Sequence, residues 1–125
     1  MALARIGLTV LDCADPATLA AFWAALLGGE TTQISDDLVL VKTGHGSLAA
    51  MRVPHYRPPT WPDGNVPKQM HLDLAVDDLD AAEAEAVRLG ARRAETQPAP
   101  TRWRVMLDPA GHPFCLCDWG KPAQG

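Results

Sequence analysis

The chain has 125 residues, the size of one average domain, which excludes a catalytic domain joined to a separate regulatory domain. Eleven basic against fifteen acidic residues give a formal net charge of -4, the wrong sign for a surface that wraps nucleic acid or binds anionic lipid. The hydrophobic content of 47% and the charged content of 21% are typical of a folded globular protein and not of a disordered chain.

The cysteine pattern indicates the compartment. Cys13, Cys115 and Cys117 have no spacing typical of a disulfide framework, which favours reduced thiols in a cytosolic protein. The N-terminal residues lack a basic leader followed by an apolar stretch, and no run approaches the roughly 18 apolar residues of a membrane span. We therefore expect a cytoplasmic protein with neither a membrane nor a nucleic-acid partner.

The first half of the chain predicts a strand, a helix and three more strands. Residues 5–12 are mostly aliphatic or β-branched, which favours a strand. Asp15 as N-cap, Pro16 in the first turn and Gly28 as a C-terminal stop bound a helix with one apolar stripe. Three short strands are expected at 30–34, 38–43 and 47–53.

The second half repeats this pattern after a proline-rich loop at 54–69. Residues 71–76 alternate in polarity and predict a strand, and Asp78 opens a helix that ends before Gly90. Three strands are expected at 92–96, 102–108 and 114–118, with a turn at 108–111 between the last two.

These two halves form an internal repeat. Placing Asp15 over Asp78 aligns Leu8 with His71 and brings the two helix-ending glycines within one residue of each other. The prediction is one α+β domain at 1–125, built from two tandem βαβββ modules at 4–53 and 70–119. Because neither module buries its sheet face alone, the modules pack together within one chain or swap between chains. A curved eight-stranded mixed sheet with a concave cleft is the expected product.

Four features together resemble the vicinal oxygen chelate superfamily, in its glyoxalase-like and bleomycin-resistance-like branch. They are the paired modules and the runs LDCADPATLAAFWAALLGGE, HLDLAVDDLDAAEAEAVRLGA and WRVMLDPAGHPFCLC, which lie between about residues 4 and 119. No single motif is diagnostic, but the order and spacing are specific. The resemblance implies the glyoxalase/bleomycin resistance/dioxygenase fold, a homodimer, and a concave face that holds a substrate and often one divalent metal.

The metal positions of the family are mostly lost here. The resemblance implies one ligand on the first strand and one near the end of the last strand of each module, which fall on Leu8, Met51, His71 and Cys115. Leu8 cannot bind a metal, and the Met51 thioether suits only soft ions. Because zinc sites take three or four protein ligands, we expect no metal at the family site and no cofactor.

Two alternatives stay open for the polar residues. Cys115 and Cys117 share one strand face, so a Cys-x-Cys site completed by His71 is conceivable, against the plainer interpretation of two core cysteines. His71 and Asp73 also share a face, and they are the best catalytic candidates as an acid and base. The plainer interpretation is a satisfied polar pair at a strand end or dimer interface.

The functional expectation is a metal-independent protein that binds a small molecule, sequestering a hydrophobic or aromatic compound such as an antibiotic. Trp61 in the proline-rich loop and Trp103 in module two offer flat aromatic faces for such a ligand. The ligand-binding residues are expected to be Leu8, Met51, Trp61, His71, Asp73, Trp103 and Cys115. The alternative is a metal-dependent glyoxalase-like lyase, isomerase or dioxygenase, so whether the protein is an enzyme stays open.

Overall fold

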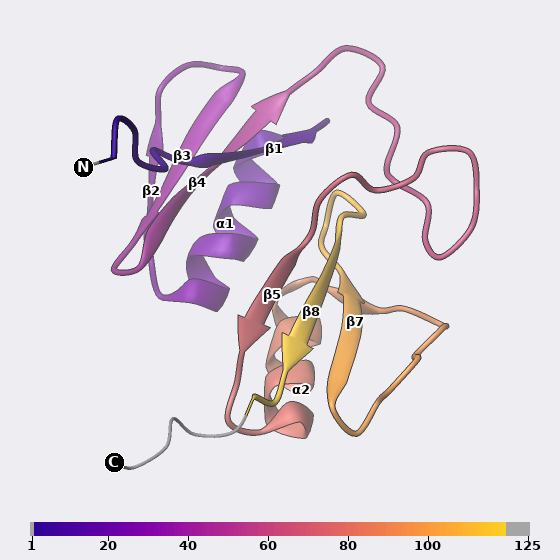
Figure 1. The fold of residues 1–125 in the computed structure, drawn as a ribbon. Coiled ribbons are helices and arrows are strands. Elements are labelled where there is room, and N and C mark those ends of the chain that lie inside the picture. The colour runs from indigo at the N-terminus through magenta and orange to yellow at the C-terminus, as the bar shows by residue number, and fades with distance from the viewer. Residues whose placement is uncertain (1, 120–125) are drawn as a thin grey trace. The chain divides into compact units, whose positions relative to one another are not determined.

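The computed structural model describes residues 2–119, which divide into two compact units, the first ending at Arg57 and the second beginning at Pro58. Residues 1 and 120–125, the ends of the predicted domain, lie outside the described residues. Each unit holds one helix and four strands in the order βαβββ (Figure 1).

The first unit is a mixed four-stranded sheet with α1 (Pro16–Leu27) on one face. Its strands β1 (Thr9–Cys13), β2 (Glu30–Gln33), β3 (Leu38–Thr43) and β4 (Gly46–Arg52) lie in the order β1-β4-β3-β2, with β1 parallel to β4. The side chain of Asp15 accepts a hydrogen bond from Thr18 N, and Gly28 ends the helix in the left-handed region at φ 70°. The apolar stripe of α1 supplies the buried Leu19, Phe22 and Trp23.

The second unit repeats this topology. Its strands lie in the order β5-β8-β7-β6, with β5 parallel to β8. The elements are β5 (Leu72–Ala75), α2 (Leu79–Leu89), β6 (Arg92–Arg93), β7 (Trp103–Leu107) and β8 (Pro113–Cys117). Asp78 caps α2 through Ala81 N, and Phe114, Leu116 and Met106 fill the core. The predicted α+β class and the two βαβββ modules are confirmed, each module forming its own four-stranded sheet.

Two of the predicted strands shorten most in the structure, β1 and β6. Residues 5–8 lie outside β1, which begins at Thr9. β6 covers only Arg92–Arg93, not 92–96. Ala94 N still donates to Val105 O at 3.0 Å, and beyond Ala94 a side chain replaces the backbone pairing. The Gln97 amide donates to Val105 O at 2.8 Å and accepts from Val105 N at 3.0 Å. It therefore bonds backbone groups of β7 that a longer β6 would have bonded.

The two faces of the second sheet differ in character. On the α2 side, Arg104 pairs with Asp80 at 2.7 Å and with Glu83 at 3.2 Å, which ties β7 to the helix. Because side chains alternate along a strand, the opposite face is formed by a different set. We call it the cysteine face; the register assigns it Asp73, Cys115, Cys117, Trp103 and Val105. Among residues 2–119, no helix is long and apolar enough to cross a membrane.

Candidate functional site

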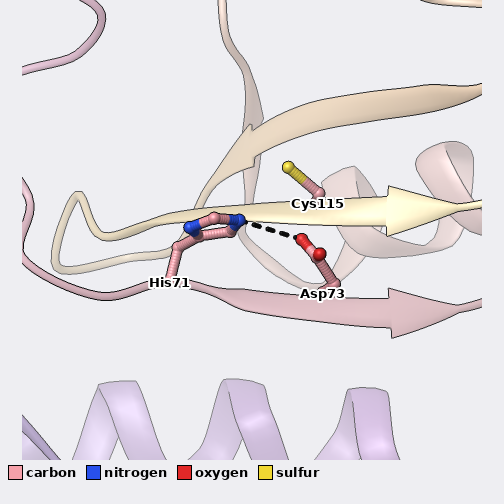
Figure 2. Close-up of side chains that lie close together, drawn as sticks. All are labelled: His71, Asp73 and Cys115. Carbon is pink, nitrogen blue, oxygen red and sulfur yellow. Dashed lines mark ion pairs between the residues drawn. The ribbon is translucent and has the colours of Figure 1, made fainter.

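Three side chains with different chemistry converge at one end of the cysteine face. His71, Asp73 and Cys115 each offer a nitrogen, oxygen or sulfur atom, and these atoms all lie within 4.8 Å of one another. Figure 2 shows the three side chains on the same side of the sheet, with His71 and Asp73 on one chain segment and Cys115 on the neighbouring strand. Within the described residues, this is the group of His, Cys and carboxylate side chains whose atoms lie close enough together to hold an ion.

Strand geometry explains the convergence. His71 directly precedes β5 and lies two residues before Asp73, so the two side chains share a face. Asp73 is the direct partner of Cys115 across the parallel β5–β8 pair. Neighbouring strands of a sheet lie about 4.7–4.9 Å apart, which brings the carboxylate and the thiol together.

Asp73 is the shared partner of this group. Its Oδ1 lies 3.0 Å from His71 Nε2, and both side chains are partly exposed, at 42% for Asp73 and 37% for His71. Burial raises the pKa of the Cys115 thiol to about 11, and the charge of Asp73 and a hydrogen bond to it raise that pKa as well. Burial, followed by the Asp73 charge, also raises the pKa of Cys117. The Cys115 thiol is therefore protonated at neutral pH.

The group can act in two chemical ways. With Nε2 facing the carboxylate, the imidazole keeps Nδ1 for a second partner, and Asp73 fixes the orientation of the ring, as in an acid–base pair. The same three donors, an imidazole nitrogen, a carboxylate oxygen and a sulfur, are also ligands of zinc and related ions.

The family's metal set, which draws on both modules, does not fit this chain. By the repeat and the strand register, the module-one counterparts of His71, Asp73 and Cys115 are Leu8, Val10 and Ala49. None of these three side chains has a donor atom. Met51 lies two residues beyond Ala49 on β4, where it corresponds to Cys117, and supplies only a thioether.

The other predicted site residues come from other segments of the chain. Trp103 is half-buried on the cysteine face, opposite Cys117 on β7. Trp61 is half-buried in the loop that precedes β5. Leu8 and Met51 belong to the first unit, with 40% and 37% of their surface exposed.

Sequence reasoning missed one relation within the site. It assigned Cys115 to a metal position and Asp73 to acid–base chemistry, and it did not connect the two. The connection depends on the pairing of β5 with β8, whose residues are more than forty positions apart in the chain. The alternation in HLDL and FCLC was the available signal, since it marks the face of each strand but not the partner strand.

Comparisons with known proteins agree with the fold. The family model described as a glyoxalase-like domain matches residues 8–117. A search of the curated proteins found no match.

Several solved structures share the fold at low sequence identity. A glyoxalase-related enzyme from Fulvimarina pelagi is 17% identical, with 98% of this chain and 96% of that chain covered and a TM-score of 0.67. A glyoxalase/bleomycin resistance protein/dioxygenase family enzyme from Burkholderia phytofirmans is 16% identical, with 92% and 98% covered and a TM-score of 0.68.

A third structure is a bleomycin-binding protein from Streptomyces verticillus, solved in complex with copper(II)-bleomycin. It is 22% identical, with 97% of this chain and all of that chain (100%) covered, and its TM-score is 0.61. Because the family model spans most of the chain and these structures share its fold, the chain belongs to the glyoxalase-like domain family of the vicinal oxygen chelate superfamily.

Proposed function

We propose that this protein binds a small organic molecule without needing a metal ion, and that it sequesters a hydrophobic or aromatic compound such as an antibiotic. The ligand contacts the cysteine face through His71, Asp73, Cys115 and Trp103. Trp61 contributes from the proline-rich loop, and Leu8 and Met51 contribute from module one.

One observation carries this proposal: the trio combines adjustable hydrogen-bonding groups with apolar surroundings on a single sheet face. Asp73 and His71 stay partly exposed, while Val105 beside Cys115 is 3% exposed and Trp103 is half-buried. Ligand pockets typically combine a mainly apolar lining with a few polar groups that fix orientation. The bleomycin-binding relative supports an aromatic natural product as the ligand class.

Metal independence rests on the lost donors. Leu8 offers no ligand atom and Met51 only a soft thioether, so the family's two-module site lacks half of its set. The His71–Asp73 ion pair at 3.0 Å also gives each group a partner without an ion.

The test is a thermal-shift screen of EDTA-treated protein against flat aromatic natural products, metal-free bleomycin among them. A ligand at about 100 times its Kd stabilises the folded state by about 2.7 kcal/mol and raises Tm by several degrees. A compound that stabilises the protein only when zinc or another divalent ion is restored would refute metal independence. The absence of any stabilising compound across the panel would count against an aromatic ligand.

The convergence of the trio favours a second candidate, a metal-dependent glyoxalase-like lyase, isomerase or dioxygenase. Its distinguishing requirement is turnover that depends on an ion and on His71. Assays of glyoxalase, isomerase and ring-opening dioxygenase substrates with and without added divalent ions separate it from the binder.

The proposal includes a homodimer in the cytoplasm. Val10, with 44% of its surface exposed, leaves apolar surface uncovered in the single chain, and such surface is common where a partner binds. Within the described residues no disulfide joins Cys13, Cys115 and Cys117, which fits a reducing compartment.

A further inference from the structure

We propose that the ligand of the cysteine face is an organic cation, a flat aromatic compound whose protonated amine pairs with Asp73 while its ring lies against Trp103. This inference rests on the proposed function and deepens it, because it names the charge of the ligand and the spacing between its amine and its ring. It makes Asp73 the residue that determines which compounds bind.

The Asp73 carboxylate has no permanent counter-ion in the chain. Among residues 2–119 its ion-pair partner is His71, whose imidazole is charged only when it is protonated. Lys68 is near enough for its charge to oppose the rise in the pKa of the Cys115 thiol, but within the same residues it is not an ion-pair partner of Asp73. A ligand amine therefore supplies a positive charge that the chain does not hold at this place.

The surroundings of this carboxylate favour a cation over an anion. Directly opposed residues form rows across the sheet, and the row of Asp73 continues with Cys115 and with Val105, which is 3% exposed. On β5, β7 and β8 the charged residue of this face is Asp73, and Arg92 lies on β6, the strand farthest from β5. In apolar surroundings an opposite charge is attracted more strongly than in water, and a like charge is disfavoured.

The strand register sets the distance between the carboxylate and the aromatic ring. Trp103 lies opposite Cys117 in the row next to that of Asp73, and it lies two strands away from β5. A strand advances about 3.3 Å per residue and neighbouring strands lie about 4.8 Å apart, so the two backbones are about 12 Å apart along the diagonal. A ligand that contacts both side chains therefore needs a spacer between its amine and its ring.

The carboxylate has room for an amine beside its present partners. A carboxylate offers about four acceptor sites. His71 approaches one oxygen of Asp73 at 3.0 Å (Figure 2), and the Cys115 thiol takes a second site. With 42% of its side chain exposed, Asp73 can accept a further hydrogen bond from a ligand while it keeps the histidine.

The internal repeat indicates that the fold does not need this charge. Module one forms the same βαβββ unit with Val10 at the position equivalent to Asp73. A charge among apolar residues is costly unless a partner compensates it. Recognition of a cationic ligand gives the departure from the module-one residue a cause that sheet packing does not supply.

The experiment is isothermal titration calorimetry of EDTA-treated, reduced full-length protein with three matched probes. Each is naphthalene with a five-carbon chain, which ends in an amine, an alcohol or a carboxylate. We expect the amine to bind at least about tenfold more tightly than the alcohol, because hydrogen bonds between charged groups are stronger than those with a neutral partner. The carboxylate should bind most weakly. A two-carbon amine should lose most of the advantage, because it does not span the two side chains.

The variants separate the charge from the shape of the site. Asp73→Asn keeps the size of the side chain and should reduce the affinity for the amine to that for the alcohol. Asp73→Val carries the module-one residue, so it should keep the native circular dichroism spectrum and lose the preference in the same way. Trp103→Leu should weaken binding of all three probes by about three- to tenfold. Asp36→Asn, at an exposed position between β2 and β3, makes the same change in net charge and should leave every affinity unchanged.

Four outcomes would overturn the proposal: equal affinity for the amine and the alcohol, tightest binding of the carboxylate, an amine preference that survives Asp73→Asn, or no binding of the amine up to millimolar concentration. In each case the proposed function stands if the thermal-shift screen yields a neutral aromatic ligand. It fails with the inference if neither the screen nor the three probes yield any ligand.

Discussion

Asp73 shapes the reactivity of its neighbours. Its carboxylate pairs with His71 and raises the pKa of both cysteines on its face. A thiol with a raised pKa is a poor nucleophile near neutral pH, because the thiolate is the reactive form. At the scale of single residues, Cys115 is therefore suited to donate a hydrogen bond, and not to attack a substrate.

Alkylation with iodoacetamide tests this state of Cys115. Because its pKa is about 11, we expect slow labelling near neutral pH and a rate that rises about tenfold per pH unit up to that pKa. Asp73→Asn removes a charge that raises the pKa, so it should increase the thiolate fraction and speed labelling. Mass spectrometry identifies the labelled cysteine, and Cys13, which is buried in the first unit, serves as the internal reference. Rapid labelling at neutral pH, or no effect of Asp73→Asn, would contradict this picture.

Sequence reasoning at this scale could identify donors but not distances. Alternation along HLDL was enough to predict that His71 and Asp73 share a face, and their side chains meet at 3.0 Å. Cys115 lies beside Asp73 only because β5 pairs with β8, and sequence periodicity does not reveal which strands pair.

At the scale of elements, the turn between β7 and β8 sets the start of the strand that carries Cys115. The run Asp108 to Gly111 predicted this turn, and the structure confirms it: Asp108 Oδ1 accepts from Ala110 N and His112 N, each at 2.9 Å. Gly111 has φ 87°, and a Cβ there would lie 2.8 Å from Pro58 Cβ. Both observations restrict the position to glycine.

Gly111→Ala should therefore destabilise the protein by about 1–3 kcal/mol, the cost of a strained backbone at one residue. Gly44→Ala is the control, because a Cβ at Gly44 meets nothing within 4 Å and its φ is not in the positive range. Urea unfolding measures both. Equal stability of the two variants would show that the turn tolerates a side chain.

The short strand β6 depends on Gln97. Its amide bonds both Val105 N and Val105 O, and also Ala94 O at 2.9 Å. Sequence periodicity predicted backbone pairing over 92–96. It could not predict that the Gln97 side chain would replace part of this pairing, because competition between a side-chain amide and a backbone partner depends on the exact path of the chain.

Gln97→Ala should lower the free energy of unfolding by about 1–3 kcal/mol, since it removes the acceptor of the N–H of the buried Val105, whose carbonyl keeps its hydrogen bond from Ala94 N at 3.0 Å. Gln69→Ala removes a single exposed hydrogen bond to Pro67 O and should change stability by less than about 0.5 kcal/mol. Urea denaturation of the two variants compares them directly. A Gln97→Ala protein as stable as the Gln69→Ala protein would mean that water replaces the amide.

At the scale of the whole molecule, the repeat was the most informative signal in the sequence. Helix caps at Asp15 and Asp78 and the spacing of strands were enough to predict two βαβββ modules, and the family model and the related structures bear out that fold. The function did not follow in the same way, because one fold carries many activities and the site residues, not the fold, decide among them.

The proposed dimer is tested by the molecular mass in solution. Size-exclusion chromatography with light scattering should give twice the 13.4 kDa chain mass at micromolar concentration. Replacing the exposed Val10 by Asp should shift the mass toward that of the monomer, while Val87→Asp, at a similarly exposed apolar residue on α2, should not. A monomer at all concentrations would remove the homodimer from the proposal.

The central claim, a small-molecule site on the cysteine face that needs no metal, is tested most directly by NMR. The measurement is a titration of ¹⁵N-labelled, EDTA-treated protein with the compound that stabilises it most in the thermal-shift screen. We predict that the largest amide shifts fall on β5, β7 and β8 around Asp73, Trp103 and Cys115. The triple variant His71→Leu, Asp73→Val and Cys115→Ala, which carries the module-one residues at these positions, should lose them. Shifts confined to other parts of the chain, or shifts that appear only when a divalent ion is added, would contradict the claim.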